Sequence, residues 1–218
     1  MKSPIATAAI VAVTLVLAAC GSTTPTPEWQ SGAHDDLQRF MASYFKGEPR
    51  ADSEFERARA QLASTGQAAL VARAELTKCA VAAASLVFDP CDGFEKLRRD
   101  APPAERAYAD YIAGHVTPAD VPLLPEQHRA IASGREDIAS VQAIADPTAR
   151  LVAAGVMFRM GRASPQVVQL AADTASHEGW RRPLLAWLGV QAQRAEHAGA
   201  KDEAQRIRRR MALISEGH

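Results

Sequence analysis

The densest group of potential recognition side chains in the sequence lies around residue 180. Trp180, Arg181 and Arg182 follow Gly179 and precede an apolar stretch with helical periodicity. Tryptophan and arginine are enriched among the residues that contribute most to protein–protein binding, so this trio is a candidate partner-binding site. The alternative is that Trp180 packs against the start of the helix that follows it. Trp187 lies between apolar residues at helical spacing, which predicts a buried position.

Arginines also gather near the end of the sequence. Arg206, Arg209 and Arg210 share one face of a predicted helix, because residues three and four apart are neighbours on a helix surface. Such a basic face suits anionic lipid headgroups or an acidic partner. It is also typical of a solvated helix face, in which Asp202 pairs with Arg206 and the cations complement the C-terminal end of the helix dipole.

The first twenty residues have the organisation of an export signal. Lys2 supplies a positive charge, residues 5–17 are uncharged and mostly apolar, and two alanines then precede Cys20. The apolar run is too short for a permanent transmembrane helix, which needs about 20 residues. It fits the apolar region of a secretory signal peptide, and an ordinary signal peptide ending at a cysteine would share these features.

The tetrapeptide Leu17-Ala18-Ala19-Cys20 resembles the lipobox of bacterial lipoproteins. The resemblance implies cleavage before Cys20, transfer of a diacylglycerol to its thiol, and further acylation by a fatty acid such as palmitate. Two or three acyl chains are sufficient for stable membrane anchoring. Gly21 stands where an aspartate would favour retention in the inner membrane, so the resemblance implies an outer-membrane lipoprotein that faces the periplasm.

The N-terminal part of the chain therefore divides into two segments. Residues 1–19 are predicted to be the signal peptide. Residues 20–33 are predicted to form the lipidated N-terminus and a flexible tether, since residues 21–32 contain Gly, Pro, Ser and Thr and have no apolar periodicity.

Two further cysteines, Cys79 and Cys91, are predicted to form a disulfide. An exported chain folds in an oxidising compartment, where a pair of cysteines commonly bridges. A helix that turns back at Asp89-Pro90 would bring the two together. The alternative is two buried free thiols. The sequence offers no second Cys/His pair at zinc-ligand spacing and no Cys-x-x-Cys motif, which disfavours metal binding and thiol redox catalysis.

Motifs of catalysis are missing from the sequence. No pair of its six histidines has the spacing of a zinc-protease motif, and the chain has neither a Gly-x-Ser-x-Gly nucleophile turn nor a phosphate-binding glycine loop. The acidic pairs Asp35-Asp36 and Glu136-Asp137 fall in predicted first helical turns, where carboxylates complement the helix dipole. We therefore expect no catalytic residue, no metal and no cofactor.

The composition excludes other functional classes. The chain has 218 residues, with 25 Lys and Arg against 25 Asp and Glu, and 47% of its residues are hydrophobic. A net charge of zero disfavours a nucleic-acid-binding protein, which needs a basic face. The hydrophobic fraction and the lack of long charge runs predict a folded domain.

The pattern of residues predicts an all-α protein built from antiparallel helical hairpins. Alanine is the commonest residue, and no stretch keeps the period of two that strands require. We expect an N-terminal helical half over residues 34–114, with helix starts at Asp35 or Asp36 and at a capping box formed by Ser53 and Glu56. A Pro-rich irregular junction over residues 115–134 then leads to a helical-repeat-like half over residues 135–218.

A repeat in the last third resembles tetratricopeptide repeats. Leu151 and Gly155 recur 34 residues later as Leu185 and Gly189, and each of the two helices precedes a second amphipathic helix. The resemblance implies an α-solenoid in the C-terminal half, in which the glycines let paired helices pack closely. Two helical hairpins of similar length would give the same pattern, and the proline that ends such a repeat is missing.

These observations give two functional hypotheses. The first is a lipid-anchored, non-catalytic adaptor or assembly factor, similar to a pilotin or scaffold, that binds another envelope protein. It would use the grooves between stacked hairpins. The alternative is a periplasmic enzyme or small-ligand-binding lipoprotein. Its site would lie between the two helical halves, near His115, His128 and Trp180.

Overall fold

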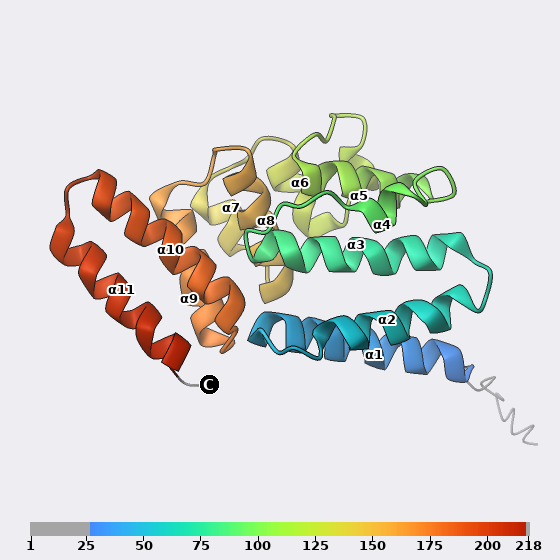
Figure 1. Cartoon of the computed structure of the whole chain (residues 1–218). Coiled ribbons are helices and arrows are strands. Elements are labelled where there is room, and N and C mark those ends of the chain that lie inside the picture. The colour runs from blue at the N-terminus through green and yellow to red at the C-terminus, as the bar shows by residue number, and fades with distance from the viewer. Residues whose placement is uncertain (1–26, 217–218) are drawn as a thin grey trace, which may run out of the picture.

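The computed structural model describes residues 27–216, and within this range every element of regular secondary structure is a helix, with no strand (Figure 1). The predicted all-α class is confirmed. The elements in order are α1 (Glu28–Lys46), α2 (Ala51–Ala63), α3 (Ala68–Ala84), α4 (Asp92–Glu95), α5 (Pro103–Ala113), the 3₁₀ helix η1 (Val121–Leu123), α6 (Glu126–Ala132), α7 (Ile138–Gln142), α8 (Pro147–Arg159), α9 (Pro165–His177), α10 (Arg181–His197) and α11 (Lys201–Glu216).

The first two helices form an antiparallel hairpin. Gly47 ends α1 in the left-handed conformation, with a φ of 71°, and its amide donates to the carbonyl of Tyr44. Phe40 of α1 stacks at a tilt on Phe55 of α2, with ring centroids 5.2 Å apart, and both rings are buried. These contacts fix the hairpin that packs against α3.

The hairpin encloses a carboxylate that the sequence analysis misplaced. Asp36 was expected near the start of its helix, but α1 begins at Glu28, so Asp36 lies in the helix interior and is buried. Its oxygens accept hydrogen bonds from Arg39, Arg57 and Gln61 at 2.8, 3.2 and 2.9 Å. Burial alone would raise the pKa of Asp36, but the hydrogen bonds and charges of the two arginines outweigh it and lower the pKa.

Two other N-terminal expectations are wrong for the same reason. Residues 28–33, assigned to the tether, form the first turns of α1, so the predicted tether is shorter. The capping box at Ser53 and Glu56 does not form, because α2 already begins at Ala51. The Ser53 hydroxyl instead donates to the carbonyl of Arg50 at 2.8 Å.

Helix α3 lies at the centre of the fold. It contacts α1, α2, α4, α5 and α8. It crosses α8 at Gly155, where a Cβ would overlap the carbonyl oxygen of Ala83 and lie 2.9 Å from its carbonyl carbon. Beside this crossing, the buried indole of Trp187 donates to the carbonyl of Ala84 at 3.1 Å. Small residues on both helices therefore allow backbone-to-backbone contact at the middle of the molecule.

The irregular segment between the two predicted halves is part of the core. It contains η1 and α6, and Leu124, His128 and Ile131 are buried. One hydrophobic cluster extends from α1 to α11 through this segment. Residues 115–134 therefore connect two regions that share a single core. The short helix α7 (Ile138–Gln142) follows this segment.

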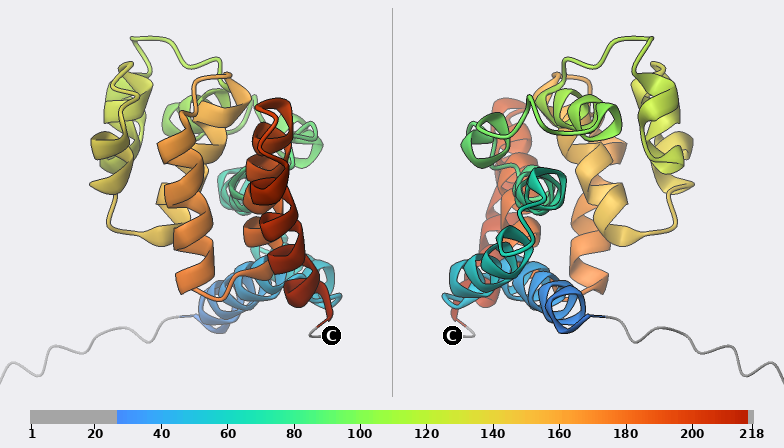
Figure 2. Two further views of the ribbon diagram at one scale, coloured as in Figure 1. Left: turned by 90° about the vertical axis from the view of Figure 1, so that its left-hand side faces the viewer. Right: turned by 90° about the vertical axis from the view of Figure 1, so that its right-hand side faces the viewer.

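The last four helices follow one another as antiparallel neighbours. Asp146 and Ser164 cap α8 and α9, accepting from the amides of Ala149 and Val167 at 2.6 and 3.2 Å. Figure 2 shows the α1–α2 hairpin at one end of the molecule, and α6 and α7 on the opposite side from α11.

The two glycines of the repeat do not have equivalent contacts. Gly155 faces the backbone of α3, whereas the nearest atom to a Cβ on Gly189 is the Cε of Met211 in α11, at 3.9 Å. The close packing at Gly155 is therefore not between paired helices of one repeat. Helical pairs are observed, but a tetratricopeptide array is not confirmed.

We predict opposite effects for alanine at these two positions. Gly155→Ala forces the α3–α8 crossing apart and lowers the free energy of unfolding by about 2–3 kcal/mol, as overpacked core sites do. Gly189→Ala has room for its methyl group and raises the free energy of unfolding by about 0.5–1 kcal/mol through helix propensity. Urea unfolding followed by circular dichroism measures both, and equal effects would contradict the crossing.

Candidate functional site

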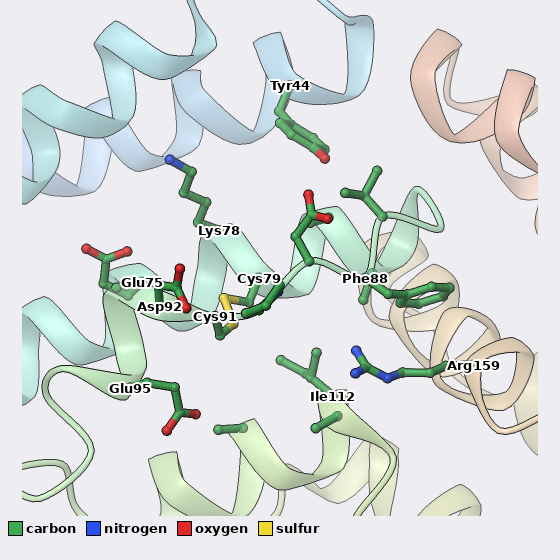
Figure 3. A pocket seen from close by; sticks show the side chains of 18 residues that line it. Tyr44, Glu75, Lys78, Cys79, Phe88, Cys91, Asp92, Glu95, Ile112 and Arg159 are labelled. Atoms are coloured by element: carbon green, nitrogen blue, oxygen red, sulfur yellow. A yellow bond between two sulfur atoms is a disulfide. The ribbon is translucent and has the colours of Figure 1, made fainter.

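A cleft of about 540 Å³ opens between α3, the loop that follows it, α5 and α8 (Figure 3). Its floor is mainly apolar, and charged side chains surround it. The residues that characterise it are Tyr44, Lys78, Phe88, Asp92, Ile112 and Arg159. A volume of this size lies within the range of small-molecule and peptide side-chain pockets, about 300–1,000 Å³.

One wall of the cleft is a loop closed by a disulfide. Cys79 in α3 and Cys91 after the loop are bonded, with Cα atoms 6.0 Å apart, which agrees with the predicted pairing. Val87 and Phe88 lie between them, and both line the cleft. The bond ties this wall to α3, because it closes a short loop on the helix that carries one of its cysteines.

The same loop starts with two unfavourable features. Leu86 has a φ of 59°, a left-handed conformation in which glycine is normally found. It occupies this position because the amide of Val87 donates to the carbonyl of Ala82 at 2.9 Å and closes the end of α3. The hydroxyl of Ser85 is buried and has no hydrogen-bond partner among the described residues. Strained backbone conformations and unpaired buried polar groups of this kind occur preferentially at functional sites.

The charged side chains around the cleft differ in the partners they have. Glu75 accepts from Arg59 at 2.6 Å, and Glu95 accepts from Arg98 at 2.7 Å. Lys78 extends toward α2 and lies 4.6 Å from the ring centroid of Phe55. Burial raises the pKa of the Tyr44 hydroxyl, which the charge of Arg182 over its ring partly opposes.

Arg159 enters the cleft from the last turn of α8. Its guanidinium carbon lies 5.4 Å from the ring centroid of Phe88, and Figure 3 shows the group directed toward Ile112. Within residues 27–216 its guanidinium has no hydrogen bond and no ion pair, and the residue is exposed to solvent. The five N–H donors of this arginine are therefore available to a ligand.

The predicted partner-binding trio lies elsewhere and has an internal role. Trp180 stacks on Phe45 of α1, with ring centroids 4.4 Å apart. Arg181 donates to the carbonyls of Lys46 and Gly47 at 3.1 and 3.2 Å, and Arg182 donates to that of Tyr44 at 2.8 Å. The trio thus satisfies the free carbonyls at the end of α1 and fastens α10 to it.

The arginines of the last helix are partly neutralised. Arg206 pairs with Glu203 and not with the expected Asp202. Arg210 donates to the hydroxyl of Ser176 at 3.0 Å. Arg209 is exposed and has no ion pair in the described part of the chain. This face is separate from the cleft and has few charges free for a ligand.

The residues proposed for an enzyme or small-ligand site do not line this cleft. His115, His128 and Trp180 are all missing from the lining of the cleft. His128 is buried beside Tyr111, whose hydroxyl lies 3.3 Å from its Nδ1. Burial lowers the pKa of His128 to about 4, which the charge of Asp146 only partly opposes. This cleft is therefore not the site that the sequence hypothesis placed near these three residues.

Sequence reasoning missed Tyr44, Phe88 and Arg159 as site residues. The cysteine pair and Asp89-Pro90 marked the loop, but no motif connected it to a side chain of α8 more than sixty residues later. Cys20 lies outside the described residues, so its lipidation stays a prediction. Within residues 27–216 no helix has the length and apolar character needed to cross a bilayer, and no three potential ligand side chains gather as a metal site.

Comparison of the chain with protein-family models, with curated proteins and with solved structures yields no match. The function is therefore argued from the sequence signals and from the cleft.

The buried imidazole gives a testable dependence of stability on pH. Unfolded His128 binds a proton below about pH 6.5, whereas the folded protein binds it only near pH 4. The free energy of unfolding therefore falls as the pH drops from 6.5 to 4, by about 3 kcal/mol from this group.

Urea unfolding at several pH values measures this effect. Between pH 6.5 and pH 4, the free energy of unfolding of His128→Phe is expected to fall by about 3 kcal/mol less than that of the wild type. His177→Gln is the control, because His177 is exposed and its replacement should leave the slope unchanged. A slope that survives in His128→Phe would contradict the assignment.

Proposed function

We propose that this protein is a lipid-anchored, non-catalytic binding protein of the bacterial envelope, whose cleft receives a short segment of another envelope protein. The observation that carries the proposal is the wall of the cleft. A loop with a left-handed leucine and an unpaired buried hydroxyl is held in place by a disulfide and presents Phe88 to the cavity. Proteins retain such costs chiefly where the resulting shape has a use.

The chemistry of the lining favours binding over catalysis. Both cysteines at the cleft are in the disulfide, and no histidine or serine is among its lining residues. A serine or cysteine nucleophile with an adjacent histidine base is therefore not assembled there. The apolar floor between charged side chains is the arrangement by which grooves bind peptide segments, with apolar contact for affinity and charges for orientation.

The membrane anchor rests on the N-terminal sequence. The resemblance of the residues around Cys20 to a lipobox supports a location at the outer membrane, with the helical domain in the periplasm. The first residue of α1 is Glu28, so only a short stretch separates the proposed lipid from the folded domain. The protein would therefore bind its partner close to the membrane surface.

We expect Cys20→Ala to abolish anchoring. Without the thiol no acyl chain is attached, and the domain should move from the membrane fraction to the soluble periplasmic fraction. Cell fractionation and immunoblotting measure the shift, with Cys79→Ser as a control that should keep its membrane association. Continued membrane association of Cys20→Ala would refute the lipid anchor.

Photo-crosslinking in living cells tests the proposed partner. A photoreactive amino acid at Val87, an exposed residue on the loop of the cleft, should repeatedly capture one envelope protein. The same label at Leu213, which is 72% exposed on α11, is the matched control and should not capture it. Mass spectrometry identifies the products.

Two outcomes would count against the proposal. Capture of the same protein from both positions would show contact outside the cleft, and no repeated capture from Val87 would refute the adaptor function. In the second case the small-ligand hypothesis would replace it, since the volume of the cleft also suits a small molecule.

A further inference from the structure

We propose that Arg159 binds a carboxylate of the partner segment, which makes a free C-terminus the part of the partner that enters the cleft. This inference rests on the proposed function and names the chemistry that the site recognises.

The first argument is the state of the Arg159 guanidinium. Arg59 and Arg98, which pair with the lining residues Glu75 and Glu95, each have a carboxylate within 2.7 Å. Arg159 has only the face of Phe88. Contact between an arginine and an aromatic ring uses the flat face of the guanidinium and leaves the N–H edge free. That edge is the part that binds both oxygens of a carboxylate.

The second argument is the surroundings of the free edge. Figure 3 places Arg159 beside Ile112 and Phe88, which are both partly or fully buried and apolar. Arg159 itself is exposed to solvent, so a carboxylate reaches the guanidinium directly, and an apolar group next to that carboxylate gains contact with Phe88 and Ile112. The last residue of a peptide with an apolar side chain has this form.

The third argument is the distribution of charge in the cleft. Glu75, Asp92 and Glu95 lie together at the end away from Arg159 (Figure 3). Glu75 and Glu95 are paired with Arg59 and Arg98, whereas the guanidinium of Arg159 is unpaired, so the Arg159 end is more favourable for an anionic group than the end that holds the carboxylates. The cleft is thus polarised, and it orients a peptide with its carboxylate toward α8.

The position of Arg159 in the last turn of α8 explains why the residue is positively charged, but not why it is an arginine and not a lysine. A cation there complements the helix dipole, and a lysine would do so equally well. Only arginine offers the planar pair of donors that matches a carboxylate. Arg159→Lys therefore separates the two roles.

The test uses the full chain in detergent micelles and two synthetic libraries of N-acetylated hexapeptides. One library has free C-terminal carboxylates, and the other has the same sequences as C-terminal amides. Fluorescence polarisation should detect peptides that bind as free acids and at least about 10-fold more weakly as amides, since a charge-assisted bidentate contact is lost. Amides that contain Asp or Glu show whether a side-chain carboxylate can replace the terminal one.

The variants locate the effect. Arg159→Gln should weaken binding of the free acids at least about 10-fold and leave binding of the amides unchanged, which also shows that the cleft is intact. Arg159→Lys should fall between the wild type and Arg159→Gln. Arg209→Gln removes an unpaired arginine outside the cleft and should change nothing.

The outcomes separate this inference from the function on which it rests. Equal binding of acids and amides, or acid binding unaffected by Arg159→Gln, overturns the carboxylate role and leaves peptide binding intact. Amides with Asp or Glu that bind as tightly as free acids keep the role of Arg159 but overturn the C-terminus as the source. If no peptide of either library binds, the proposed function and this inference are both refuted.

Discussion

The crossing of α3 and α8 is the constraint on which the rest of the structure depends. At this point Gly155 allows the backbones to touch, and the indole of Trp187 fixes α10 to the end of α3 through the Ala84 carbonyl. The loop of the cleft starts directly after Ala84, and Arg159 lies one helical turn beyond Gly155. One contact therefore positions both walls of the cleft, because the loop begins, and α8 ends, within about one helical turn of the crossing.

The disulfide extends this constraint from the helices to the loop. A left-handed leucine is unfavourable for an L-residue, and the local bond from the Val87 amide to the Ala82 carbonyl holds it at the end of α3. The bond between Cys79 and Cys91 connects the far end of the loop back to α3. The crossing fixes where the loop begins, and the bond fixes where it returns. Phe88 is thus held where its ring can support Arg159.

The parts of the fold that could be predicted from sequence are those decided by local interactions. Asp146 and Ser164 cap their helices through amides three residues away, and such caps are visible in the sequence. Asp36 was misplaced because its burial depends on Arg57, which belongs to another helix. The glycine of the repeat was interpreted within its own hairpin, whereas its neighbour is Ala83, more than seventy residues earlier.

The candidate site was harder to predict, because arginines that cannot be distinguished in the sequence have different partners in the structure. Arg181 and Arg182 look like binding residues in the sequence, but they satisfy carbonyls at the end of α1. Arg159 is an exposed residue at a helix end, but it lines the cleft and its guanidinium has no partner in the described part of the chain.

These arginines differ in whether a hydrogen-bond acceptor lies within reach of the guanidinium, which is a property of the folded chain. In a chain with equal numbers of acidic and basic residues, most arginines can find a partner within the fold. An arginine that rests on an aromatic ring and has no carboxylate beside it is then an informative exception, since the fold leaves its donors for another molecule.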